Sequence, residues 1–517
     1  MNQGLIPAKW AALTPRNEAI VDVPNNRRLD YVEFDGLVRR LANGLRGLGL
    51  EKGDRFGVLS RNCAEYMALY FAAGRAGLML QPLNWRLAGE ELATIVRDAA
   101  PKVIISQDEF GEAIEQLQRD VDVPNWLQFG DKSDGSFTRL VESSSDDEPI
   151  WVSCVLDDDP FFILYTGGTT GKSKGAMHTH RSAGAMMLAQ TVAERIVPSD
   201  VYMLTGQMYH IPIVLAMNYN RHGCPLVLVN FEAKQALEII QEEKVSAFLG
   251  ITTMINWMMA VPDFASYDLS SLRNFQYGGG PMPSSVVRAA MDNFPCTMIQ
   301  GYGQTEGAGM TFLSQEDHIR AVNGDHPERL RSCGREGFTA QIRVVDDNGR
   351  DVPQDGKTAG QIVVRGEQNM IGYLNQPELS AQTIRDGWMW TGDMATWDDE
   401  RYVFIVDRAK DMIISGGENI YSVQVEEAIN QHPAVLECAV FGIPDDEWGE
   451  AVKAVVVLKP GTQATEQEII DEAKKHLASY QKPRSVDFVG QLPKAPTGKI
   501  LKRELRTPYW AERDRGV

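Results

Sequence analysis

The sequence predicts an α/β protein, with a large N-terminal domain of layered α/β subdomains plus a small β unit, followed by a smaller α+β C-terminal domain. A chain of 517 residues is too long for one hydrophobic core. Short apolar runs alternate with helical patterns through most of the chain, which favours helices packed on sheets. After Ser332 short β-like runs and turns take over, which indicates a separate β unit.

The individual elements follow from residue spacing. A helix is predicted within Leu29–Gly49, because Leu37, Leu41 and Leu45 recur at helical intervals and the glycine offers a stop. Further helices are predicted at Lys234–Glu243 and Pro283–Asn293. Buried strands are predicted at Lys102–Ser106, Phe161–Thr166, Pro225–Val229 and Thr297–Gln300.

The last part of the chain is predicted to form a domain of its own. The β unit before it is expected from Gln341–Val345, Gly360–Arg365 and Arg401–Val406, with a turn at Asp347-Asn348-Gly349. Beyond Asp407, the patterns predict helices at Val423–Asn430 and Glu466–Ala478 and a strand at Lys453–Leu458. The remaining length, roughly 110 residues, suffices for a domain. The predicted domains are therefore 1–406 and 407–517.

Composition excludes several classes of partner. The net charge is −19, from 70 acidic and 51 basic residues, which argues against nucleic acid and against an anionic membrane surface. No apolar run approaches the roughly 20 residues of a membrane span, and no signal peptide is evident. The six cysteines lack metal-ligand spacing and predict reduced thiols. We expect a cytoplasmic protein without integral membrane association. Its oligomeric state stays open, a homodimer included.

The most informative segment is Tyr165-Thr-Gly-Gly-Thr-Thr-Gly-Lys-Ser-Lys-Gly175, which follows a predicted buried strand. Glycines let backbone N–H groups approach an anion, threonine hydroxyls donate to phosphate oxygens, and lysines supply positive charge. The segment therefore predicts a phosphate-binding loop. A flexible surface loop is the alternative, and it is disfavoured because the segment directly follows that strand.

Two other nucleotide motifs fail by one residue each. A Walker A loop needs a glycine where this chain has Thr166. The run Gly301-Tyr-Gly-Gln-Thr-Glu306 imitates a dinucleotide fingerprint except at its last position, where a carboxylate would repel pyrophosphate. Beside phosphate Glu306 is reasonable only as a ligand of Mg²⁺.

Taken together, six motifs in order resemble the adenylate-forming (ANL) superfamily of acyl-CoA synthetases (AMP-dependent CoA ligases), peptide-synthetase adenylation domains and firefly luciferase. The resemblance covers nearly the whole chain. The motifs are Tyr165–Gly175, Tyr277–Pro281, Gln300–Glu306, Trp390–Asp393, Asp407–Asp411 with Ser415–Asn419, and Pro493–Lys499.

The resemblance implies roles for residues that bind ATP. Those that match the loop around the β- and γ-phosphates are Thr166, Gly168, Thr169, Thr170, Gly171 and Lys174. Those that match the adenine slot are Gly279, Gly280 and Tyr302, whose ring would stack on the base. Asp393 and Arg408 match the pair that holds the ribose hydroxyls. Ser173 departs from the family's usual proline and predicts a less rigid loop.

The resemblance also implies the catalytic groups. Thr305 would contact the α-phosphate, Glu306 would bind Mg²⁺, and Lys499 would bridge the substrate carboxylate and the α-phosphate. His210 matches a position that often closes the acyl site until ATP binds. The C-terminal domain would be mobile, turning about Asp407. One orientation would present Lys499, and the other would place Gly416 and Gly417 beside the pantetheine of coenzyme A.

Each residue taken alone has an ordinary explanation. Asp393 could be a turn residue, Arg408 could form a surface ion pair, His210 could be a satisfied core histidine, and Lys499 could be merely solvated. Tyr302 is harder to explain, because the glycines beside it would leave its ring exposed in the absence of a ligand.

The implied activity is an ATP-dependent carboxylic acid–CoA ligase that acts through an acyl-adenylate and uses ATP, Mg²⁺ and coenzyme A. One alternative is an adenylating enzyme with another acceptor, either a carrier protein or an oxidative reaction, and another is a nucleotide-binding pseudoenzyme. The small residues Gly280, Gly303, Ala308 and Gly309 predict room for a medium- or long-chain fatty acid, an aryl acid or an alicyclic acid. Which acid is used cannot be predicted.

Overall fold

The structure is a computed structural model that describes residues 1–166, 173–280, 282–408, 411–415, 418–445, 448–494 and 500–510. The described chain divides into two compact units. The first comprises Met1–Thr166, Ser173–Ile342 and Val364–Met389. The second comprises Arg343–Val363 and the described residues from Trp390 onward. Each unit is described separately.

A nine-stranded sheet forms one half of the first unit, in the order β15-β14-β13-β12-β11-β9-β10-β1-β2. Six neighbouring strands, from β13 to β1, run parallel, and the strands at both edges are antiparallel. The bounds are β1 Glu18–Asp22, β2 Arg27–Asp30, β9 Tyr202–Leu204, β10 Leu226–Leu228, β11 Ala247–Gly250, β12 Asn274–Gly278, β13 Thr297–Gln304, β14 Gly307–Leu313 and β15 Arg335–Glu336.

A seven-stranded sheet forms the other half, in the order β18-β8-β7-β4-β3-β5-β6. Strands β7, β4, β3, β5 and β6 are parallel, while β8 and β18 add antiparallel pairs at one edge. The bounds are β3 Arg55–Leu59, β4 Met79–Pro82, β5 Val103–Gln107, β6 Asn125–Phe129, β7 Pro160–Thr166, β8 Lys174–Thr179 and β18 Gly372–Tyr373.

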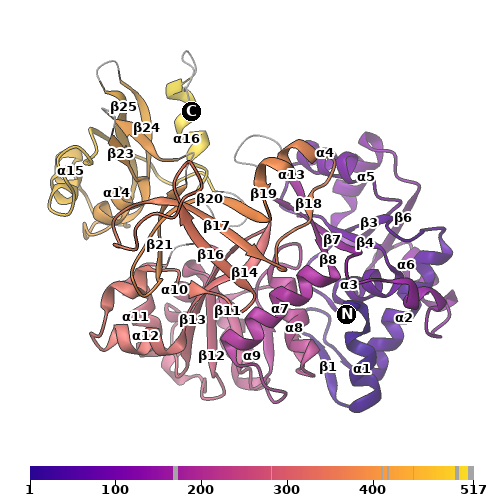
Figure 1. The fold of residues 1–517 in the computed structure, drawn as a ribbon. Coiled ribbons are helices and arrows are strands. Elements are labelled where there is room, and N and C mark those ends of the chain that lie inside the picture. The colour runs from indigo at the N-terminus through magenta and orange to yellow at the C-terminus, as the bar shows by residue number, and fades with distance from the viewer. Residues whose placement is uncertain are drawn as a thin grey trace. The chain divides into compact units, whose positions relative to one another are not determined.

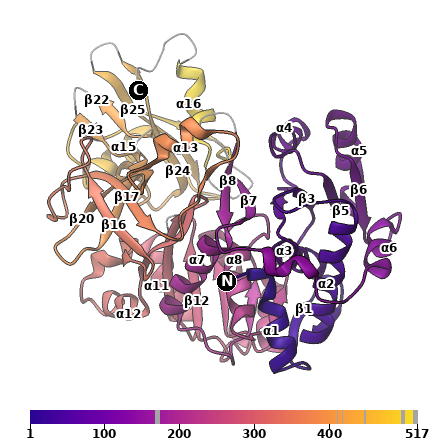
Figure 2. The same ribbon diagram turned by 45° about the vertical axis from the view of Figure 1, so that its right-hand side comes forward.

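Helices cover both faces of the two sheets (Figures 1 and 2). Apolar side chains of α2, α3, α7 and α8 share one core with both sheets, whereas α9–α11 pack on the other face of the larger sheet and α4 and α5 on the other face of the smaller one. The bounds are α1 Ile6–Leu13, α2 Tyr31–Gly47, α3 Ala64–Ala76, α4 Gly89–Ala99, α5 Gly111–Asp120, α6 Ser136–Ser143, α7 His180–Glu194, α8 Pro212–Arg221, α9 Ala233–Glu242, α10 Thr252–Met259, α11 Ser284–Asn293, α12 Gln315–Val322 and α13 Pro377–Thr383.

Local sequence explains why α2 begins where it does. The Asp30 side chain accepts from the backbone N–H of Glu33, and the Glu33 side chain accepts from the Asp30 N–H, so the two residues form a capping box. The leucines that predicted this helix face the core, where Leu41 and Leu45 are fully buried. The predicted helix is confirmed, as are the strands and helices predicted along the rest of this unit.

The predicted β unit is a five-stranded sheet in the order β16-β17-β20-β19, with β21 paired to β20. Its turn is tight, because the Gly349 N–H donates to the Asp346 carbonyl at 2.9 Å and Gly349 has a φ of +73°. The bounds are β16 Ala340–Val345, β17 Gly360–Gly366, β19 Ile384–Arg385, β20 Trp388–Trp397 and β21 Val403–Arg408.

A second five-stranded sheet follows in the C-terminal segment, in the order β23-β22-β25-β24 with β26 paired to β25. Its core is separate from the others and includes Val425, Val440 and Ile469, as expected of a segment that folds on its own core. The bounds are β22 Ile413–Ser415, β23 Glu418–Ile420, β24 Val435–Asp445, β25 Gly449–Leu458, β26 Ser485–Phe488, α14 Ser422–Ile429, α15 Glu466–Lys474 and α16 Lys502–Trp510.

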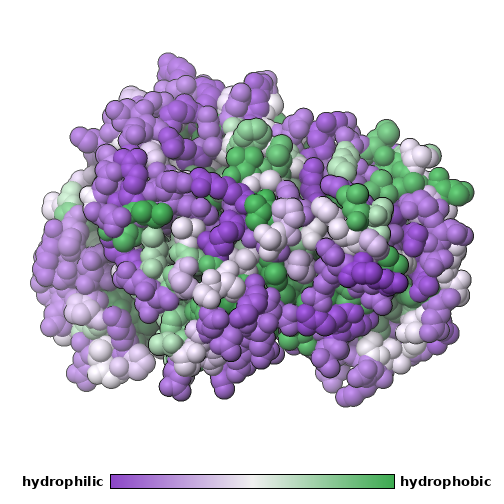
Figure 3. All heavy atoms as spheres, turned by 90° about the horizontal axis from the view of Figure 1, so that it is seen from below, coloured by the Kyte–Doolittle hydropathy of each residue, from purple (hydrophilic) through white to green (hydrophobic). Residues whose placement is uncertain are grey.

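The surface agrees with the composition. Hydrophilic side chains cover most of the face in Figure 3, and apolar ones form small groups among them. None of the helices in the described ranges is long and apolar enough to cross a membrane. All six cysteines are free thiols.

Candidate active site

The predicted site residues of the first unit gather where parallel strands of the larger sheet end. In open α/β sheets, the carboxyl ends of parallel strands are the usual position for ligands. His210 follows β9, Gly279 and Gly280 follow β12, and the pair Thr305–Glu306 follows β13. These residues belong to motifs that are separate in the sequence. The parallel strands bring the motifs together at the carboxyl end of the sheet.

The predicted phosphate loop joins two paired strands. Strands β7 and β8 run antiparallel, and the Cα of Thr166 lies opposite that of Lys174. The Nζ atom of Lys174 lies 5.4 Å from the centroid of the Tyr373 ring, which is within cation–π range. The loop residues Gly168, Thr169, Thr170 and Gly171 lie outside the described residues, so their predicted role is unchanged.

The two glycines after β12 border open space. A Cβ atom built on Gly279 or on Gly280 would meet no heavy atom of the described residues within 4 Å, and Gly279 has a φ of +75°, which favours glycine. The next strand leaves no such space, since a Cβ on Gly303 would lie 2.8 Å from the Ala308 Cα. Of the small residues that predicted a roomy acyl site, Gly280 borders open space, whereas Gly303 is small because the backbone is close.

Tyr302 differs from the expectation for an isolated ring. It lies in β13 opposite Thr311 of β14 and is only 8% exposed, so the neighbouring glycines do not leave it uncovered. The prediction of an exposed ring was wrong because the pairing of β13 with β14 was not foreseen. The predicted stacking on adenine stays a prediction.

Thr305 and Glu306 form the two-residue turn between β13 and β14, where Gln304 pairs with Gly307. Three hydrogen bonds hold this turn. The His178 Nε2 atom lies 2.7 Å from the Thr305 carbonyl, the Met370 N–H donates to the Glu306 carbonyl at 2.7 Å, and the Tyr373 hydroxyl donates to Glu306 Oε1 at 2.6 Å. These hydrogen bonds therefore fix the backbone of the turn and one carboxylate oxygen of Glu306.

Burial fixes the protonation state of His178. It lowers the pKa of this histidine to about 4, so the ring is neutral at neutral pH. A carbonyl oxygen only accepts hydrogen bonds, so the proton of the ring lies on Nε2. The histidine acts here as a fixed hydrogen-bond donor.

His210 is not a satisfied core histidine. Its Nε2 atom is buried and has no hydrogen-bond partner among the described residues, while its ring packs edge-on against Tyr209 at 4.6 Å between centroids. Burial, and then the charge of Arg86, lowers the pKa of His210 to about 4. A neutral imidazole with an unused nitrogen fits a position that meets a ligand.

In the second unit, Asp393 and Arg408 are partners in register. Asp393 lies in β20 and Arg408 in β21, and their Cα atoms are paired across the two antiparallel strands. Asp393 is 5% exposed and belongs to a strand, so it is not a surface turn residue. Their backbone register is therefore known, and their joint role at the ribose stays a prediction.

The remaining predicted residues, Gly416, Gly417 and Lys499, lie outside the described residues. Nearby, Asp407 is buried, and its carboxylate accepts from both the N–H and the hydroxyl of Ser422. Asp407 is thus well anchored within the second unit.

The donor set agrees with Mg²⁺ bound together with a nucleotide. Among the described residues, no cluster of three or more histidine, cysteine, aspartate or glutamate side chains is placed to hold a metal ion. Mg²⁺ is commonly held by one or two carboxylates together with substrate phosphates. Glu306 supplies one carboxylate, and no donor from the described residues reaches its Oε2 atom, so the site fits the ion.

Two residues of this site were missed from the sequence. Tyr373 and His178 contact the Thr305–Glu306 turn from strands that are 67 and 127 positions away in the chain. Local spacing carries no signal for such contacts. The glycine before Tyr373 and the turn-forming Asn375-Gln-Pro377 after it marked only a turn.

The chain resembles known proteins along nearly its whole length. The profile of the AMP-binding enzyme family matches residues 7–374, and that of the AMP-binding enzyme C-terminal domain matches residues 424–499. A long-chain-fatty-acid–CoA ligase of Mycobacterium tuberculosis, FadD13, is 35% identical over 516 residues, which cover 99% of each chain. A feruloyl-CoA synthase of an Amycolatopsis species is also 35% identical, over 98% of this chain and 99% of that one. The crystal structure of ATP-bound MatB from Rhodopseudomonas palustris superposes with a TM-score of 0.86 at 28% identity, over 98% of this chain and 99% of that one.

Proposed function

The chain belongs to the family of AMP-binding enzymes, and we propose here which of its residues carry out the reaction. The reaction is that of an AMP-forming acid–CoA ligase. A carboxylic acid and ATP form an acyl-adenylate and pyrophosphate, and the acyl group then passes to the thiol of coenzyme A with release of AMP. ATP and coenzyme A are the co-substrates, and Mg²⁺ accompanies ATP.

One observation supports the nucleotide site above all others. The Thr305–Glu306 turn and Lys174 are held at one end of the first unit, since Tyr373 contacts both Lys174 and Glu306. Gly279 and Gly280 follow β12, the parallel neighbour of β13, and border open space there. We assign the phosphates to the loop between Thr166 and Lys174 and the adenine to the space beside the two glycines. Asp393 and Arg408 then hold the ribose.

Charge neutralisation is the main requirement of the first step. A carboxylate must approach a polyphosphate, so alignment and positive charge lower the barrier. Mg²⁺, when bound with ATP at Glu306, supplies part of that charge. Lys499 supplies the rest at the reacting carboxylate, and Thr305 orients the α-phosphate.

The second step uses a different part of the C-terminal segment. We assign the pantetheine to the glycines Gly416 and Gly417, and we place the domain boundary between Val406 and Asp407. Lys499 then serves adenylation alone. His210 gates the acyl site. The support is its buried Nε2, which has no hydrogen-bond partner in the part of the chain that the structure describes.

The substrate is proposed as a fatty acid or an aryl acid. Relatives at 35% identity are named for long-chain fatty acids and for ferulate. An alicyclic acid is a third candidate. We further propose a cytoplasmic enzyme, and a homodimer stays a prediction that sedimentation would test.

A panel of acids tests the assignment directly. We expect fatty or aryl acids to drive exchange of labelled pyrophosphate into ATP, EDTA to abolish it, and CoA thioesters to form only when coenzyme A is added. Lys499→Ala should block exchange yet still convert a supplied acyl-adenylate into the thioester. Equal loss in both half-reactions would contradict the role given to Lys499.

A further inference from the structure

Tyr373 occupies a junction between the two sheets of the first unit. It lies in the short strand β18, whose Cα register pairs Tyr373 with Ala176 of β8. The ring is 6% exposed and packs with Ala176 and Met370. Its position is therefore fixed by backbone pairing and by a small apolar cluster.

The side chain contacts two groups of opposite charge. Its hydroxyl donates to Glu306 Oε1 at 2.6 Å, and its ring lies 5.4 Å from the Lys174 Nζ. The hydroxyl is the donor of this bond, because a carboxylate oxygen only accepts.

The rest of the Glu306 residue is already immobilised. The carbonyls of Thr305 and Glu306 accept from His178 and from the Met370 N–H, each at 2.7 Å. With the backbone fixed, rotation about the side-chain bonds is the freedom that remains to the carboxylate. The hydrogen bond from Tyr373 restricts this rotation. The other oxygen, Oε2, has no donor from the described residues.

We propose that Tyr373 is a positioning residue for the metal-binding carboxylate: it occupies one oxygen of Glu306 and thereby orients the other toward Mg²⁺. The proposal rests on the assignment of Glu306 as the Mg²⁺ ligand. Hydrogen-bonding partners of metal ligands orient those ligands, and their loss commonly weakens metal binding about 10- to 100-fold.

Tyr373→Phe is the informative variant, because it keeps the ring over Lys174 and removes the hydroxyl. The affinity of the enzyme–ATP complex for Mn²⁺ is measured by electron paramagnetic resonance, without acid, so that no turnover occurs. We expect about 10-fold weaker Mn²⁺ binding. In exchange assays, the Mg²⁺ concentration at half-maximal rate should rise, while the KM for the acid should stay unchanged.

A matched control removes a similar bond elsewhere. Tyr219→Phe deletes a buried hydroxyl that donates to the carboxylate of Glu194 in the same unit. It should leave Mn²⁺ affinity at the wild-type value. If both tyrosine variants weakened Mn²⁺ binding equally, the effect would be one of general stability, and the proposal would be overturned.

A second variant guards against misfolding of the first. Glu306→Asp withdraws the carboxylate from the Tyr373 hydroxyl and from the metal without deleting the charge, so it should weaken Mn²⁺ binding at least as much as Tyr373→Phe. The double variant should lose no more than Glu306→Asp alone, because the contact with Tyr373 is already broken in that variant. Additive losses, or wild-type Mn²⁺ affinity in Tyr373→Phe, would overturn the positioning role. Wild-type Mn²⁺ affinity in Glu306→Gln would instead reject the metal assignment itself.

Discussion

The first unit contains two glutamates that each accept a hydrogen bond from a tyrosine, and their surroundings differ. Tyr219 donates to Glu194 Oε2 at 2.5 Å, and Gln190 donates to its Oε1 at 3.0 Å, so both oxygens are satisfied and the residue is 1% exposed. Glu306 is only partly buried and accepts from Tyr373 through one oxygen. In a structural carboxylate, protein donors occupy both oxygens, whereas a carboxylate that binds a ligand keeps one oxygen available.

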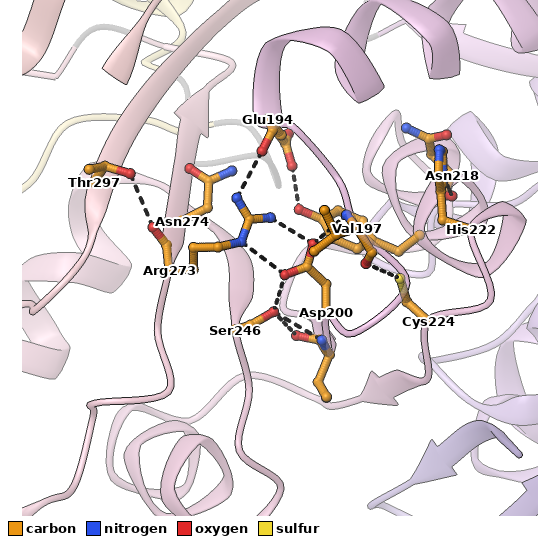
Figure 4. Close-up of polar contacts among 12 residues, drawn as sticks. Glu194, Val197, Asp200, Asn218, His222, Cys224, Ser246, Arg273, Asn274 and Thr297 are labelled. Carbon is orange, nitrogen blue, oxygen red and sulfur yellow. Dashed lines mark hydrogen bonds and ion pairs between the residues drawn. The ribbon is translucent and has the colours of Figure 1, made fainter. Parts of the chain in front are cut away.

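The surroundings of Glu194 extend this contrast. Arg273 donates to the Glu194 carbonyl at 3.1 Å and to both oxygens of Asp200, and the Ser246 hydroxyl donates to Asp200 at 2.8 Å (Figure 4). This network joins the end of α7 to β9 and β12. Its bonds are directed at other protein groups, which indicates a role in holding the fold.

The largest expected effect comes from neutralising Glu306, the carboxylate that keeps one oxygen available. Glu306→Gln should lower the rate of pyrophosphate exchange about 100- to 1000-fold, because charge stabilisation in the site is lost. The amide oxygen can still accept from Tyr373, so the midpoint of urea unfolding should not change. Glu194→Gln is the matched variant and should retain wild-type exchange. The contrast between the two glutamates fails if both variants lose the same activity.

Removing Asp200 from the network around Glu194 should lower the stability of the fold and leave the rate of pyrophosphate exchange unchanged. Asp200 is 2% exposed and also accepts from the Val197 N–H at 2.9 Å, so Asp200→Ala removes the acceptor of that N–H, of two Arg273 donors and of the Ser246 hydroxyl. We expect a loss of about 2–4 kcal/mol in the free energy of unfolding. Urea unfolding measures it.

The control for this variant is Asp146→Ala, which removes an exposed ion pair with Arg40. Its unfolding midpoint should match that of the wild type, since surface pairs contribute little. Equal losses in the two aspartate variants would show that the network around Asp200 is no more important to the fold than a surface pair.

The sequence could predict local features of the fold and of the site, but it could not predict contacts between residues that are distant in the chain. Several strands and helices could be predicted because apolar spacing is local, and Thr305 and Glu306 could be singled out because their motif is contiguous. Tyr373 and His178 were missed because their partners are distant in the chain. The burial of Tyr302 was missed for the same reason, since it depends on how β14 pairs with β13.

The smallest expected effect is a pH dependence of stability that belongs to Glu194. Burial raises the pKa of this carboxyl from 4.5 to about 7, despite the hydrogen bonds from Tyr219 and Gln190 and the nearby charge of Arg273. Between these two values the folded protein binds a proton that the unfolded chain has released. The free energy of unfolding should therefore fall as the pH rises from 4.5 to 7 and level off above 7.

Glu194→Gln removes the titrating group and should flatten this part of the pH profile. Relative to the wild type, the variant should gain about 1–3 kcal/mol in free energy of unfolding between pH 5 and pH 8. Urea unfolding of both proteins at several pH values measures the difference, and groups that titrate in both proteins cancel in it. Parallel profiles would mean that the protein around Glu194 stabilises its charge as well as water does. Glu194 would then differ from Glu306 only in its hydrogen-bond geometry, and the burial of its charge would not destabilise the fold.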